Sequence, residues 1–141
     1  MNIGIIGSGG REHAICYKIN QSNSNHNIYC FPGNAGTSEI STNVLINPDN
    51  FEELYEFSIK KKIELIIVGP ENPLVNGIVD FFLERNIMIF GPNKMASQLE
   101  GSKIFMKSFC INNKIPTAKY FEVTDLKSAK DFLITANFPV V

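Results

Sequence analysis

The first thirteen residues, MNIGIIGSGGREH, constrain the fold of this chain more than any other stretch. An apolar run predicts a strand over residues 2–6, and helical spacing of apolar residues predicts a helix over residues 11–20. A glycine-rich turn joins them, so a helix begins at the carboxyl end of a strand. Free backbone N–H groups and the positive pole of the helix dipole favour an anion there, phosphate above all.

The glycine spacing separates this turn from that of a dinucleotide-binding enzyme. Gly7 and Gly9 fit the fingerprint G-x-G-x-x-G, but Glu12 stands where its third glycine belongs. The second predicted strand, residues 28–31, ends in Pro32, Gly33 and Asn34 rather than in an acid that binds ribose. A dinucleotide-dependent oxidoreductase therefore remains an alternative, although the third glycine and the ribose-binding acid are both missing. A plain strand–helix turn without a ligand is a second alternative.

Strands and helices alternate along the first two thirds of the sequence. Beyond residue 27 we predict strands at 28–31, 42–46, 63–68 and 87–90, and helices that open at 48–49 and cover 74–85 and 94–99. The β-branched run at 63–68 is typical of a central parallel strand that is covered on both faces. This order predicts an α/β fold with a Rossmann-like parallel sheet. Four loops rich in Gly, Pro and Asn should meet at the carboxyl edge of that sheet, at 7–11, 32–37, 69–74 and 91–93.

The pattern changes at Ser102, which predicts one domain over residues 1–101 and a second that begins at residue 102. Ser102 is a candidate cap for a helix over Lys103–Asn112, which Pro116 interrupts. We then predict, in order, a strand, a helix and a strand: 120–123, 125–136 and 138–141. Because the sequence stops inside an apolar run, we expect this chain to be the front of a longer protein.

Charge and cysteine content exclude several classes of partner. The chain has 13 basic and 14 acidic residues, so nothing predicts binding to nucleic acid or to an anionic membrane. Cys16, Cys30 and Cys110 have neither C-x-x-C spacing nor histidines at metal-ligand intervals, which predicts reduced, mostly buried thiols in a cytoplasmic protein. The sequence contains no signal-peptide pattern and no stretch of about 20 apolar residues.

Five ordered motifs together resemble the glycinamide ribonucleotide synthetase family, also called phosphoribosylamine–glycine ligases. They are residues 7–13, 32–37, 68–77, 90–92 and 99–103, and residues 114–118 extend the resemblance to nearly the whole chain. The resemblance implies an ATP-grasp ligase that joins glycine to 5-phosphoribosylamine in purine biosynthesis through a glycyl phosphate. ATP is then a co-substrate, and Mg²⁺ or Mn²⁺ neutralises its phosphates. Residues 1–101 would form the pre-ATP-grasp domain, and residues 102–141 would begin the ATP-grasp domain.

The resemblance and the loop positions together suggest residues for the substrate. The backbone of Gly9 and Gly10 and the guanidinium of Arg11 suit the 5-phosphate or the ribose, although a first-turn arginine is often simply solvated. Glu71 is expected at the ribose hydroxyls, or else serves as an acid that the helix dipole favours. Asn34 is expected to hydrogen-bond the ligand, or else occurs because asparagine tolerates left-handed backbone.

The remaining assignments concern ATP and catalysis. Lys103 matches the family's cation for the nucleotide phosphates, with a surface lysine as the alternative. Glu12 and His13 are adjacent on a helix and do not face each other, so we predict a structural role for His13. The resemblance places the glycine-rich lid and the metal-binding acids after Val141, so we assign no catalytic residue and expect this chain alone to be inactive and monomeric. A stand-alone sugar-phosphate-binding module and other ATP-grasp ligases of purine or biotin metabolism remain alternatives.

Overall fold

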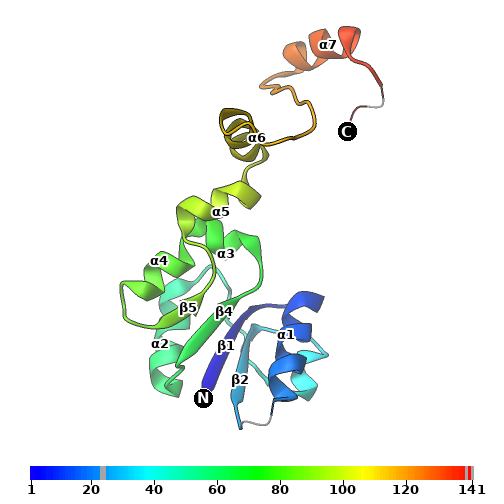
Figure 1. Cartoon of the computed structure of the whole chain (residues 1–141). Helices are drawn as coiled ribbons and strands as arrows, with labels where there is room; N and C mark the ends of the chain where they lie inside the picture. Colours follow the sequence, from blue (N-terminus) through cyan, green and yellow to red (C-terminus); the bar gives the residue numbers. More distant parts are fainter. Residues whose placement is uncertain (23–24, 139, 141) are drawn as a thin grey trace. The chain divides into compact units, whose positions relative to one another are not determined.

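The computed structural model describes residues 1–22, 25–138 and 140, and the chain divides into two compact units, Met1–Gly101 and Ser102–Val141 (Figure 1). Within the described part of the first unit, five parallel strands form one sheet in the order β3-β2-β1-β4-β5. The strands are β1 (Asn2–Gly7), β2 (Asn27–Pro32), β3 (Thr42–Asn43), β4 (Leu65–Val68) and β5 (Met88–Phe90). The predicted α/β fold with a Rossmann-like parallel sheet is confirmed.

Strand β1 lies at the centre of this sheet and marks the point where the strand order reverses. Its residue Ile3 is in register with Ile28 of β2 on one side and with Leu65 of β4 on the other. Strands β2 and β3 therefore lie on one side of β1. Strands β4 and β5, which follow later in the sequence, lie on its other side. The crevice at the carboxyl ends of β1 and β4 is the position where such sheets bind ligands.

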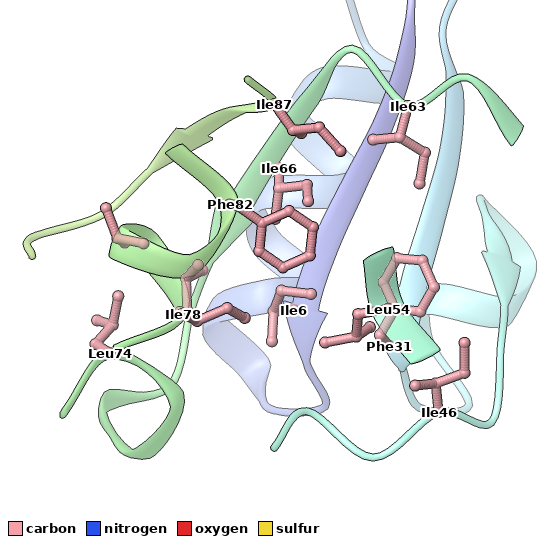
Figure 2. Close-up of a cluster of buried hydrophobic side chains, with 12 residues drawn as sticks. Ile6, Phe31, Ile46, Leu54, Ile63, Ile66, Leu74, Ile78, Phe82 and Ile87 are labelled. Atoms are coloured by element: carbon pink, nitrogen blue, oxygen red, sulfur yellow. The ribbon is translucent and has the colours of Figure 1, made fainter. Parts of the chain in front are cut away.

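Helices cover both faces of the sheet, which explains why the strand sequences are apolar at nearly every position. They are α1 (Gly10–Asn20), the 3₁₀ turn η1 (Thr37–Glu39), α2 (Phe51–Lys61), α3 (Glu71–Asn76), α4 (Ile78–Leu83) and α5 (Lys94–Gly101). Ile5 of β1 packs with Cys16 of α1 on one face. Its neighbour Ile6 packs on the other face with Leu54 of α2 and Phe82 of α4 (Figure 2).

Several predicted boundaries in the first unit are wrong. The helix predicted over residues 74–85 is two helices, because Gly77 adopts left-handed backbone with φ 99° and donates its N–H to the carbonyl groups of Pro73 and Leu74. The first of these helices already begins at Glu71, since a proline in the first turn costs no backbone hydrogen bond. Strand β3 ends at Asn43 instead of residue 46, and α5 continues through Gly101 instead of ending at residue 99.

The second unit contains helices α6 (Lys103–Asn112) and α7 (Leu126–Thr135). Ser102 caps α6 as predicted, because its Oγ accepts the N–H of Phe105 at 3.2 Å. The strand predicted at 120–123 is wrong: no described residue of this unit pairs with it, and Phe121 instead stacks on Phe132 at 4.8 Å between ring centroids. The strand predicted at 138–141 lies partly outside the described residues, which omit 139 and 141.

The apolar core of the first unit provides a direct test of the fold. Phe82 is fully buried, and its ring lies 5.3 Å from that of Phe81, whereas Phe90 on strand β5 is 71% exposed. We predict that Phe82→Ala lowers the free energy of unfolding by about 3–5 kcal/mol, because it leaves a cavity. Phe90→Ala is the matched control and should change it by less than about 0.5 kcal/mol. Urea unfolding followed by circular dichroism measures both, and equal midpoints would contradict this core.

Candidate functional site

A cleft of about 500 Å³ opens at the carboxyl ends of β1 and β4. Residues 7–12, 48–49 and 70–73 line it. Two of the four predicted loops therefore meet here. The other two do not line the cleft: Gly33 donates its N–H to the carbonyl of Gly7 behind it, and Gly91 packs against Leu74. Pro48 and Asp49 were missed as site residues, because the sequence identified them only as the opening of a helix.

Glu12 is the residue that organises the walls of the cleft. Its side chain is 4% exposed, and Oε2 accepts the N–H of Gly9 at 2.6 Å. The carboxylate fills the space beside two glycines: a Cβ on Gly7 would lie 2.7 Å from its Cδ, and a Cβ on Gly69 would overlap Oε1. The side chain therefore joins the loop after β1 to the loop after β4. The sequence contained a signal for this role, since an acid three residues after a helix cap often accepts the N–H of the cap residue.

Arg11 joins the same two loops from the first turn of α1. Its Nη1 donates to the carbonyl oxygen of Gly69, and the side chain lines the cleft. A guanidinium carries five N–H groups, so donors remain for a ligand in the cleft. Arg11 is exposed but also bonded to the loop after β4, and its contact with the substrate stays a prediction.

Gly9 and Gly10, the two candidate glycines, differ in the surroundings of their backbone. The N–H of Gly9 is used by Glu12, and its carbonyl accepts from the N–H of His13 at 3.1 Å. Gly10 is the first residue of α1, and no atom lies within 4 Å of the place where its Cβ would be. A ligand can therefore approach the backbone at Gly10 more closely than at Gly9.

Asn34 lies behind the cleft and holds the loops in place. Its amide nitrogen donates to the carbonyl groups of Ser8 at 2.8 Å and Gly9 at 3.2 Å, while its Oδ1 accepts the N–H of Thr37 at 3.0 Å. Its backbone is not left-handed, and Gly33 is the residue of this loop with positive φ, at 74°. Left-handed backbone is therefore the wrong reason for this asparagine. Both the nitrogen and the oxygen of its side-chain amide are therefore hydrogen-bonded to other groups of the protein.

The cleft is also lined by acids. Glu71 is exposed at the first position of α3 and lines the cleft together with Asp49, whose Oδ1 accepts from the amide of Asn76 at 3.0 Å. Among the lining residues, Arg11 is the cation and Glu12, Asp49 and Glu71 are the acids. The cleft therefore offers both donors for an anion, at Gly10 and Arg11, and carboxylates that accept hydrogen bonds.

His13 and Lys103 are not among the residues that line the cleft. The ring of His13 packs on Gly36, where a Cβ would lie 2.6 Å from Cε1, which fits the structural role predicted for it. Lys103 is exposed at the first position of α6, in the second unit. Across residues 1–22, 25–138 and 140, no three His, Cys, Asp or Glu side chains gather as a metal site requires. Over the same residues, no helix has the length and apolar character needed to cross a membrane.

Comparison with known proteins identifies the family. The sequence model described as phosphoribosylglycinamide synthetase, N domain, matches residues 1–100. This chain belongs to the phosphoribosylglycinamide synthetase family. The resemblance inferred from the five motifs is therefore confirmed, and the cleft lies within the residues that the family model matches.

Relatives and a solved structure agree with this assignment. Over the whole chain, the sequence is 45% identical to a phosphoribosylamine–glycine ligase of Clostridium acetobutylicum and 48% identical to one of Haemophilus influenzae. The chain spans only about a third of these curated relatives, 34% and 33% of their lengths. The crystal structure of the phosphoribosylamine–glycine ligase from Thermotoga maritima matches 84% of this chain and 26% of that one, with 32% identity and a TM-score of 0.60.

The packing of Glu12 against Gly69 predicts opposite effects for two glycine substitutions. Gly69→Ala places a methyl group where the carboxylate of Glu12 lies, so we expect it to lower the free energy of unfolding by about 1–3 kcal/mol. Gly10→Ala is the matched control, because its methyl group enters open space on a helix and should be neutral or stabilising. Thermal unfolding compares the two, and equal losses would show that Glu12 does not fill this space.

Proposed function

We propose that this chain is the part of a phosphoribosylamine–glycine ligase that binds 5-phosphoribosylamine. The observation that supports this most directly is the cleft at the switch point of the sheet, which Gly10, Arg11 and Glu71 line together. Family membership and the names of the relatives supply the substrate.

The donors and the acceptors that line the cleft suit different parts of that substrate. The first N–H groups of α1 and the guanidinium of Arg11 suit the 5-phosphate or the ribose beside it, because both donate hydrogen bonds from positively charged positions. The carboxylate of Glu71 accepts hydrogen bonds from ribose hydroxyl groups. Gly9 and Asn34 act indirectly in this proposal, since their polar groups hold the loop that carries Gly10.

We further propose that the whole enzyme uses ATP to convert the glycine carboxylate to glycyl phosphate. The amine of phosphoribosylamine then attacks the carbonyl carbon, the C–N bond forms, and phosphate leaves. The groups of this chain bind and orient the amine substrate. No cluster of metal ligands is present among its described residues, so we derive no step through a metal ion from it.

Residues 102–141 are proposed to begin the ATP-grasp domain, with Lys103 directed to the phosphates of ATP. None of the described residues of this unit is buried, and apolar side chains such as Phe121 and Ile134 are 56% and 81% exposed. A larger domain built from the rest of the relatives' length would cover them. We therefore expect no ligation of glycine by the 141-residue chain alone.

A dinucleotide-dependent oxidoreductase is disfavoured by the position of Glu12. The third glycine of that fingerprint lets a helix pack closely on a strand near the pyrophosphate. Here a buried carboxylate stands at that position and fills the space beside Gly7 and Gly69.

Ribose 5-phosphate, a stable relative of the substrate, tests the proposal on the 141-residue chain. We predict that it shifts the NMR signals of residues 8–11 and 71–72, and that NADH does not. Glu71→Gln should weaken binding of ribose 5-phosphate by about 10-fold, because a hydrogen bond to a charged group contributes about 1.5 kcal/mol or more. It should not weaken binding of inorganic phosphate, since a carboxylate opposes a phosphate nearby. Arg11→Gln should weaken binding of both ligands.

Glu56→Gln provides the matched control, since Glu56 is an exposed acid on α2 that does not line the cleft. It should leave both affinities unchanged. If Glu71→Gln and Glu56→Gln behave alike, Glu71 does not contact the ribose. If ribose 5-phosphate shifts signals only outside the cleft, the proposed substrate site is wrong.

A further inference from the structure

The two buried cysteines of the first unit form a pair that the cleft does not use. We infer that Cys16 and Cys30 form a reversible disulfide when the protein meets hydrogen peroxide. Cys16 lies on α1 and Cys30 on β2, both are fully buried, and their Sγ atoms are 3.1 Å apart. Neither thiol belongs to a metal-ligating cluster of the described residues.

The surroundings of the pair bring the sulfur atoms together. Ile3, Ile5 and Ile28 enclose them in the smaller apolar cluster, between α1 and the sheet. A disulfide bond is about 2.05 Å long, so the two sulfur atoms need to approach by only about 1 Å. The 3.1 Å separation of the two sulfur atoms is the observation on which the inference rests.

The environment also assigns different roles to the two thiols. The hydrogen bond that Cys16 donates lowers the pKa of Cys30 to about 7, assisted by the hydroxyl groups of Ser41 and Thr37 and opposed by burial and the charge of Glu12. The same hydrogen bond and burial raise the pKa of Cys16. We therefore expect Cys30 to react first and Cys16, whose Sγ lies 3.1 Å away, to resolve the product.

The chemistry balances with peroxide as the oxidant. The Cys30 thiolate attacks one peroxide oxygen, the O–O bond breaks, and a sulfenic acid and hydroxide form. The Cys16 sulfur then attacks the Cys30 sulfur, the S–S bond forms and the S–O bond breaks. The hydroxyl group leaves as water with the Cys16 proton. Two thiols are oxidised and one peroxide is reduced to two waters, and a dithiol reductant reverses the change.

Both thiols are fully buried, so a small oxidant is expected to reach them by way of the residue beside Cys30 that is nearest to solvent. The Oγ of Ser41 lies 3.2 Å from the Sγ of Cys30, and Ser41 is only partly buried. Hydrogen peroxide is close to water in size, whereas alkylating reagents are larger and should react more slowly.

The test uses the 141-residue chain with Cys110→Ser, so that the pair supplies its only thiols. Treatment of the folded protein with hydrogen peroxide should reduce its intact mass by about 2 Da, because two hydrogen atoms are lost. Peptide mapping without reductant should show a Cys16–Cys30 cross-link, and dithiothreitol should restore the original mass. Circular dichroism confirms that the variant is folded before the reaction.

Two further variants separate the roles of the thiols. With Cys16→Ser added, we expect no loss of mass, and Cys30 should instead gain about 16 Da as a sulfenic acid that dimedone captures. With Cys30→Ser added, Cys16 should react far more slowly. Gains in steps of about 16 Da without a cross-link in the two-thiol protein would overturn the inference. So would no change at a peroxide concentration that oxidises the same thiols in urea. Neither result bears on ribose 5-phosphate binding.

Discussion

The carboxylate of Glu12 is the group on which the shape of the cleft depends. An acid that is 4% exposed is costly to bury unless hydrogen bonds and close packing compensate for lost water. The N–H of Gly9 provides such a bond at 2.6 Å, and the bare backbones of Gly7 and Gly69 provide the space. Because Gly7 follows β1 and Gly69 follows β4, one side chain determines how far apart the two walls stand.

The adjacent Arg11 makes a second link between the same two loops. Two consecutive residues of α1 reach the same loop, one by packing on Gly69 and the other by donating to its carbonyl group. The remaining N–H groups of the guanidinium then lie at the cleft, close to the first residue of the helix. The turn resembles a dinucleotide fingerprint but is built differently. A carboxylate stands at the position of the third glycine, and the loop after β4, rather than a pyrophosphate, packs against the turn.

Patterns that depend on local sequence were predictable, and those that depend on tertiary contacts were not. The β-branched run at 63–68 identified a doubly covered strand, and the glycine turn identified the switch point, because burial imposes both. Gly77 divides a helical pattern without changing its apolar spacing, so the pattern suggested one helix. Residues 120–123 have strand-like composition, but a strand also requires a neighbour to accept its hydrogen bonds. Asp49 lines the cleft only because α2 begins beside α3, which no local pattern contains.

The charge balance of the cleft bears on the part of a sugar phosphate that it can bind. One guanidinium and the amino end of a helix line it together with three carboxylates, those of Glu12, Asp49 and Glu71. Acids accept hydrogen bonds from sugar hydroxyl groups well, but they oppose a doubly charged phosphate nearby. In the proposed complex, the residues of this chain therefore suit the ribose better than they neutralise the phosphate.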